Sequence, residues 1–125
     1  MFRRLWLLMG AVVLCGCGGP VYDETLSGPY KLWATDIDEQ MHVCYAFDGG
    51  CIGRIPATVF QVGFDERYVV AASQVTSNSV GYFYIIRDID GVSVDPSVSV
   101  HGPFDATAFA EERSRMGLPE LKPIK

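Results

Sequence analysis

Short segments with alternating apolar residues run from Tyr30 to Ile86, and turn-forming residues separate them. A side-chain period of two is typical of β-strands, because successive side chains point to opposite faces of a sheet. Met41–Phe47 alternates in this way, and Tyr82–Ile86 is the run richest in strand-forming residues. Val69–Ala72 is apolar throughout, which predicts a central strand covered on both faces. The other predicted strands are Tyr30–Thr35, Ile52–Ile55, Thr58–Phe64, Tyr68–Gln74, Val92–Val94 and Val98–Val100.

A single helix is predicted after these strands. Asp105 can cap its first turn, and Gly117 followed by Pro119 can end it. Between them lies an apolar stripe at helical spacing, which consists of Ala106, Phe109, Ala110 and Met116. Glu111 and Arg115 can pair on the solvent side. The order of elements predicts an α+β, mostly β, fold: an antiparallel sheet or a small open barrel of short strands with one C-terminal helix packed on it.

Residues 1–16 have the composition of an export signal. Arg3 and Arg4 precede an apolar run, Leu5–Leu14, which is too short to cross a bilayer as a helix. The run ends in Leu14-Cys15-Gly16-Cys17, which resembles the lipobox of bacterial lipoproteins. The resemblance implies cleavage before Cys17 and lipidation of Cys17, whose acyl chains would then anchor the protein. The alternative is an ordinary secreted protein that is cut near Gly16 or Gly19.

The lipoprotein interpretation divides the chain into three segments. Residues 1–16 are the predicted lipoprotein signal peptide, 17–29 the lipidated cysteine and a flexible tether, and 30–125 one small β-rich domain with the C-terminal helix. The expected location is the cell envelope, with the protein held there by lipid. Gly18 follows the cysteine where an Asp could stand, which in a Gram-negative cell resembles the pattern of lipoproteins on the periplasmic side of the outer membrane.

The charge of the chain restricts its partners. The full chain has ten basic and fifteen acidic residues, and loss of Arg3 and Arg4 with the signal gives the mature chain a net charge of −7. Nucleic acid and anionic lipid headgroups bind surfaces that carry positive charge. We therefore expect no nucleic-acid partner and expect contact with the membrane through the acyl chains on Cys17, since two or more such chains hold a protein stably.

Two of the four cysteines, Cys44 and Cys51, lie in the predicted domain. They flank a predicted turn that contains Asp48, Gly49 and Gly50. Folding the segment back on itself brings the two cysteines within disulfide reach, and disulfides persist in exported proteins. The alternatives are a pair of free thiols or half of a metal site, although no Cys-x-x-Cys pair or histidine cluster accompanies them.

The sequence contains no recognisable catalytic, metal or cofactor motif. His42 and His101 are far apart and stand in no metal-ligand spacing, and no serine lies in Gly-x-Ser-x-Gly. Each acidic pair can serve in a turn or on a solvated face, and these pairs are Asp36/Asp38, Asp65/Glu66, Asp88/Asp90 and Glu111/Glu112. We therefore expect no cofactor and no metal.

Aromatic residues on the predicted strands are further candidates for a binding surface. Alternation places Tyr82 and Tyr84 on one face of their strand, and Trp33 lies on an earlier strand. These three side chains are a candidate interaction surface if that face meets solvent, because tyrosine and tryptophan often anchor protein contacts. Packing into the core explains them equally well.

The stretch Val62-Gly-Phe-Asp-Glu-Arg-Tyr-Val-Val-Ala-Ala, the strand Tyr82–Ile86 and the helix that ends in Arg-Met-Gly-Leu-Pro resemble a group of small bacterial lipoproteins that carry a domain of unknown function. The resemblance implies an exported, anchored domain with no assigned activity. The leading hypothesis is a non-enzymatic envelope binding module, for example an inhibitor or immunity-like protein. The alternatives are a hydrolase directed at the cell wall, using an acidic pair or His42, and a structural subunit of an envelope complex.

Overall fold

The computed structural model describes residues 19–124 of the chain. The predicted signal peptide and the predicted lipidation site, Cys17, lie outside the described residues. Within the described part, no helix is long and apolar enough to span a membrane.

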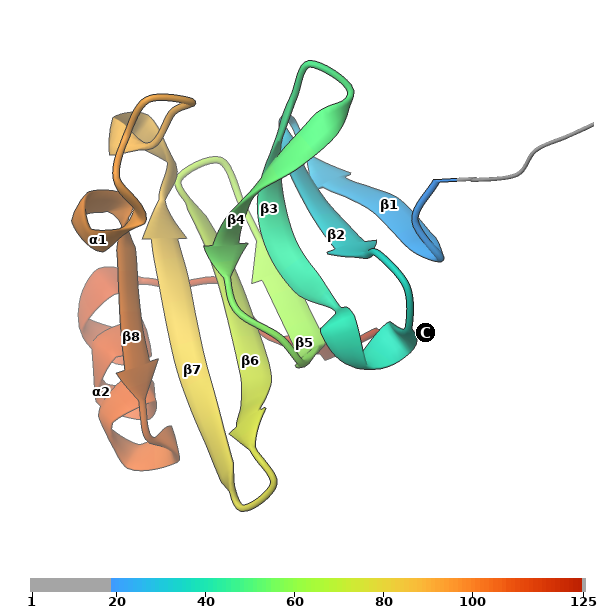
Figure 1. The fold of residues 1–125 in the computed structure, drawn as a ribbon. Coiled ribbons are helices and arrows are strands. Elements are labelled where there is room, and N and C mark those ends of the chain that lie inside the picture. Colours follow the sequence, from blue (N-terminus) through green and yellow to red (C-terminus); the bar gives the residue numbers. More distant parts are fainter. Residues whose placement is uncertain (1–18, 125) are drawn as a thin grey trace, which may run out of the picture.

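The described residues form two antiparallel sheets that face each other, with one long helix on the far side of the second sheet (Figure 1). The first sheet has the order β1-β2-β3-β4, with strands Tyr22–Ser27, Tyr30–Ala34, His42–Phe47 and Gly50–Ile55. The second has the order β8-β7-β6-β5-β9, with strands Val100–Phe104, Ser79–Ile86, Tyr68–Thr76, Val59–Phe64 and Lys122–Pro123. The helices are η1 Asp38–Gln40, η2 Arg87–Ile89, α1 Pro96–Ser99 and α2 Ala106–Met116.

This architecture confirms the prediction of a mostly β, antiparallel fold with a C-terminal helix. The strands divide into two sheets, and neither sheet closes into a barrel. Short hairpin connections account for the antiparallel pairing of most sequence neighbours. The β3–β4 hairpin turns at Asp48 and Gly49, both of which have positive φ angles, of 55° and 80°. Such angles suit the residue types found there.

The main core lies between the two sheets. Alternate side chains of β2 and β3 point inward from the first sheet, and alternate side chains of β6 and β7 meet them from the second. The buried members of this core are Tyr30, Leu32, Ala34, Met41, Val43, Ile55, Val59, Val69, Ala71, Phe83 and Ile85. Burial of apolar surface on this scale is the principal stabilising contribution in a domain of this size.

A second core lies between the second sheet and α2. Its buried members are Tyr68, Val70, Tyr84, Phe109 and Leu118. Strand β6 therefore contributes Val69 to one core and Val70 to the other. This confirms the central, doubly covered strand that the apolar run Val69–Ala72 predicts.

Helix α2 begins and ends as predicted. The side chain of Asp105 accepts a hydrogen bond from the backbone N–H of Ala108 at 2.7 Å, and Gly117 ends the helix with a φ angle of 70°. The predicted pair of Glu111 with Arg115 is wrong. Glu112, one residue later, accepts from Arg115 at 2.6 Å, because residues three apart are also neighbours on a helix surface.

After α2 the chain crosses back over the second sheet to form β9. Close to this crossing, a Cβ atom on Gly63 of β5 would overlap the backbone carbonyl of Glu120. Glycine at position 63 therefore allows the returning segment to lie against the sheet. The N–H of Ile124 then donates to the carbonyl of Phe60 at 3.2 Å, which extends the attachment of the C-terminal segment to β5.

The predicted tether is too long. Residues 22–27, which the sequence analysis assigned to a flexible tether, form β1 and pair with β2. The side chains of Tyr22 and Leu26 point toward the core. Their spacing was the sequence signal for a strand, but the prolines and glycines on either side favoured the prediction of a tether. The domain therefore begins earlier than the predicted boundary at residue 30.

Two predicted strands near residue 95 are also wrong. Residues 92–94 lie in a loop, and Pro96–Ser99 form the short helix α1 instead of the start of a strand at Val98. Asp95 caps α1 by accepting from the N–H of Ser97 at 2.8 Å, and Pro96 stands at its first turn. Both residues favour a helix start, which outweighs the strand preference of the valines. Only Val100 belongs to a strand, at the start of β8.

Candidate functional site

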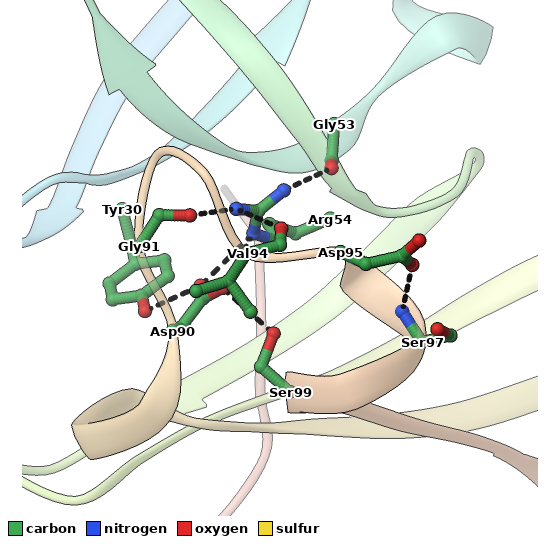
Figure 2. Close-up of polar contacts among 9 residues, drawn as sticks. All are labelled: Tyr30, Gly53, Arg54, Asp90, Gly91, Val94, Asp95, Ser97 and Ser99. Carbon is green, nitrogen blue, oxygen red and sulfur yellow. Dashed lines mark hydrogen bonds and ion pairs between the residues drawn. The ribbon is translucent and has the colours of Figure 1, made fainter.

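A buried ion pair joins Arg54 of β4 to Asp90, which follows η2. Nε of Arg54 lies 3.0 Å from each carboxylate oxygen of Asp90. Both side chains are 0% exposed. Figure 2 shows the pair enclosed between the first sheet and the loop before α1. Burial of two charges is unfavourable unless every polar atom finds a partner.

Each partner of the pair makes further hydrogen bonds that satisfy it (Figure 2). Asp90 accepts from the Tyr30 hydroxyl at 2.8 Å and from Ser99 Oγ at 2.7 Å. Arg54 donates to three backbone carbonyls, those of Gly53, Gly91 and Val94. The cluster therefore ties β2 and β4 of the first sheet to the connection between β7 and β8 of the second.

The environment of the cluster also acts on Tyr30. Its burial, together with the hydrogen bond to Asp90, raises the pKa of the Tyr30 hydroxyl. The hydroxyl therefore stays protonated and remains a donor to the carboxylate. The cluster stabilises the contact between the two sheets. Its hydrogen-bond donors and acceptors are bonded to other members of the same cluster.

A second polar group lies where α2 meets β7 and β8. The Tyr84 hydroxyl donates to Glu112 at 2.7 Å, and the ring of Tyr84 stacks on His101 with a centroid separation of 4.9 Å. Burial and the bond to Glu112 raise the pKa of Tyr84 to about 12. Hydrogen bonds from Arg115 and then Tyr84 hold the pKa of Glu112 below its ordinary value. Nε2 of His101 is buried without a hydrogen-bond partner among residues 19–124.

A hollow lies at the open edge of the sandwich, between β1 and the β5–β9 edge. It encloses about 430 Å³. Its walls are Glu24, Leu26, Val62, Gly63, Phe64, Pro119, Glu120, Lys122 and Pro123. A second hollow of about 340 Å³ continues it toward Tyr22, Leu32 and Ile124 and shares the middle of the wall. We call the two together the edge groove.

The edge groove combines apolar walls with a few charged groups. Phe64 is 46% exposed although it is a large hydrophobic residue, and Leu26 and Val62 are partly buried beside it. Glu24 accepts a hydrogen bond from the hydroxyl of Tyr22. That bond raises the pKa of Tyr22. An apolar concave surface with a few placed polar groups is the usual form of a binding site.

The predicted disulfide is present and joins Cys44 of β3 to Cys51 of β4, with their Cα atoms 5.5 Å apart. The two cysteines are diagonal neighbours across the hairpin, because Cys44 pairs with Gly53 and Cys51 pairs with Ala46. The bridge therefore reinforces the hairpin that carries Arg54.

The three aromatic residues of the predicted interaction surface do not come together. Tyr84 is 3% exposed, and the ring of Tyr82 stacks on Phe109 of α2 at 5.2 Å. Both tyrosines therefore lie under α2, which is the core alternative that the sequence left open. Trp33 lies on the other sheet, half-buried, with Nζ of Lys31 5.4 Å from its ring centroid.

Sequence reasoning missed the residues that the structure gathers. The sequence analysis assigned Asp90, with Asp88, to a turn or a solvated face, and it did not select Arg54. The available sequence signal for a buried ion pair was the charged residue Arg54 next to the apolar Ile55 in a short strand. Among the described residues, no group of three or more His, Cys, Asp and Glu side chains is placed to hold a metal ion.

No family model, curated protein or solved structure matches this chain. The class that the geometry defines is an open two-sheet antiparallel sandwich with one covering helix.

Proposed function

We propose that the protein is a lipid-anchored lipoprotein of the bacterial cell envelope and that its domain is a binding module. The observation that supports lipid anchoring is the sequence Leu14-Cys15-Gly16-Cys17 at the end of a short apolar run. The resemblance to a lipobox makes Cys17 the acylated first residue of the mature chain. In a Gram-negative cell, Gly18 favours the periplasmic side of the outer membrane.

The early start of β1 supports a position close to the membrane. Only residues 18–21 separate Cys17 from Tyr22, the first residue of β1. Four extended residues span at most about 14 Å. The domain of the anchored protein would therefore rest near the headgroups, with little freedom to explore the space beyond them.

The charge of the mature chain supports anchoring by acyl chains. A net charge of −7 opposes adsorption to anionic lipid. In the described part, the connection from β2 to β3 carries Asp36, Asp38 and Glu39, all exposed, on the side of the domain where β1 begins. Lipid on Cys17 would hold the domain against this repulsion.

The edge groove supports a binding role. It is concave and partly apolar and adjoins an edge strand, the combination that many binding sites use. The buried Arg54–Asp90 cluster supports the same role indirectly, because it fixes the two sheets whose separation forms the groove.

The anchor is tested by the intact mass of protein extracted from membranes with detergent. The wild-type chain is expected to begin at Cys17 and to carry the added mass of acyl chains. Cys17→Ser should remain unprocessed and unacylated. Cys15→Ser is the matched control, because it changes a cysteine inside the signal and should leave the mature mass unchanged. Wild-type protein that lacks any acyl mass would refute the proposal.

A further inference from the structure

We infer that the outer edge of β1 binds an extended peptide strand that carries a basic side chain between apolar ones. The added strand would lengthen the first sheet, and its inward side chains would enter the edge groove. This inference deepens the proposed binding role and depends on it, but it does not depend on lipidation of Cys17.

The backbone of β1 presents free hydrogen-bonding groups to this edge. In the described residues 19–124, β1 pairs on one side only, with β2. The N–H of Ala46 in β3 donates to the carbonyl of Pro29, so Lys31 of β2 bonds to β3 and its neighbour Leu32 bonds to its partner in β1, Glu24. Hydrogen-bonded pairs alternate along an antiparallel ladder, so the N–H and C=O groups of Asp23 and Thr25 point away from β2. An exposed edge of this kind is a template for an added strand.

The inward side chains next to these two residues line the groove. Tyr22 and Glu24 are both in the wall of the hollow between the sheets. A strand that bonds to the backbone of Asp23 and Thr25 would therefore place alternate side chains in the groove, beside Leu26, Val62 and Phe64. Main-chain bonds would supply affinity, and the groove would select the alternate side chains.

The charges select a basic residue on the partner. Glu24 and Glu120 stand in the groove wall against one cation, Lys122. A guanidinium or ammonium group on the added strand would complement this net negative charge. The hydrogen bond from the Tyr22 hydroxyl orients the carboxylate of Glu24, which lies in the groove wall.

The probe is the synthetic peptide acetyl-Thr-Val-Thr-Arg-Thr-Val-Thr-amide, added to the full chain in detergent micelles. Amide hydrogen exchange is measured residue by residue by NMR. The N–H groups of Asp23 and Thr25 should exchange about tenfold more slowly at a peptide concentration about ten times its dissociation constant. A matched peptide with Glu in place of Arg should bind about two- to fivefold more weakly, the range expected for one exposed charge pair.

Two variants separate local charge from the charge of the whole protein. Glu24→Lys should reverse the preference, so that the Glu peptide binds more tightly than the Arg peptide. Asp23→Lys changes the net charge equally, but its side chain lies on the opposite face, beside Lys31. This control should keep the preference for the Arg peptide. Unfolding curves of both variants check that the domain remains folded.

Three results would overturn the inference. One is unchanged exchange at Asp23 and Thr25 in the presence of saturating peptide. Another is an equal effect of Asp23→Lys and Glu24→Lys on the charge preference. The third is protection of these amides that rises with protein concentration without peptide, because it would identify a second copy as the occupant. None of these three results changes the mass expected for the lipidated chain. Failure of the peptide-binding inference can therefore be distinguished from failure of the proposed lipid anchor.

Discussion

The Arg54–Asp90 pair allows a quantitative prediction of stability. Asp90→Leu removes the acceptor of the Arg54 guanidinium and of two hydroxyl donors, on Tyr30 and Ser99. Since both members of the pair are 0% exposed, water cannot replace the lost partner without opening the interface between the sheets. Breaking such a pair costs about 3–5 kcal/mol. We therefore expect a loss of this size in the free energy of unfolding.

The assay is reversible unfolding of the full chain in detergent, by heat and by denaturant. For a domain of this size, 3 kcal/mol corresponds to a fall in melting temperature of roughly 12 °C or more. Asp88→Asn is the matched control, because Asp88 is exposed in the same short segment. Its effect should stay within about 0.5 kcal/mol.

A double variant tests the reasoning more strictly. Arg54→Met combined with Asp90→Leu removes both charges and fills their space with apolar groups. It should be more stable than either single variant, because no unpaired charge stays buried. If Asp90→Leu unfolds within about 1 kcal/mol of wild type, or if the two single effects simply add, the pair does not hold the sheets together as argued.

Three other predictions concern separate parts of the fold. Gly63→Ala should destabilise the domain by about 1–3 kcal/mol through its clash with the Glu120 carbonyl, whereas Gly53→Ala, with no atom within 4 Å of the new Cβ, is the control in the same unfolding assay. Replacing Cys44 and Cys51 together by Ser should cost about 2 kcal/mol, measured against oxidised wild type in the same assay. The lowered pKa of Glu112 means that its ionised form stabilises the fold above its ordinary pKa of 4.5 and that this contribution is lost as the pH falls through the folded value. The difference in melting temperature between wild type and Glu112→Gln should therefore be largest at neutral pH and shrink in acid, and a difference independent of pH would contradict this.

The sequence predicted those parts of the fold that depend on local signals. The alternation of apolar residues located most strands, the apolar run Val69–Ala72 identified the central strand, and Asp105 with Gly117 marked the ends of α2. The disulfide was predictable because the turn between its cysteines fixes their separation. Each of these signals lies within about a dozen residues of the feature that it determines.

The features that the sequence did not predict depend on contacts between distant segments. Asp90 meets Arg54 across 36 positions and Tyr30 across 60, and no local pattern connects them. Strand β1 becomes stable by pairing with β2, although its own residues, such as Glu24 and Thr25, are polar. The edge groove exists only because two sheets separate at one side, and that separation is a property of the assembled sandwich.

The buried pair also bears on how this chain can change over generations. An intermediate that has lost only one of the two charges would carry the full destabilisation, a large share of the free energy that keeps a small domain folded. Sequences that diverge from this one should therefore keep Arg54 and Asp90 together or replace them together. Substitutions at positions 54 and 90, which are 36 residues apart, should therefore occur together.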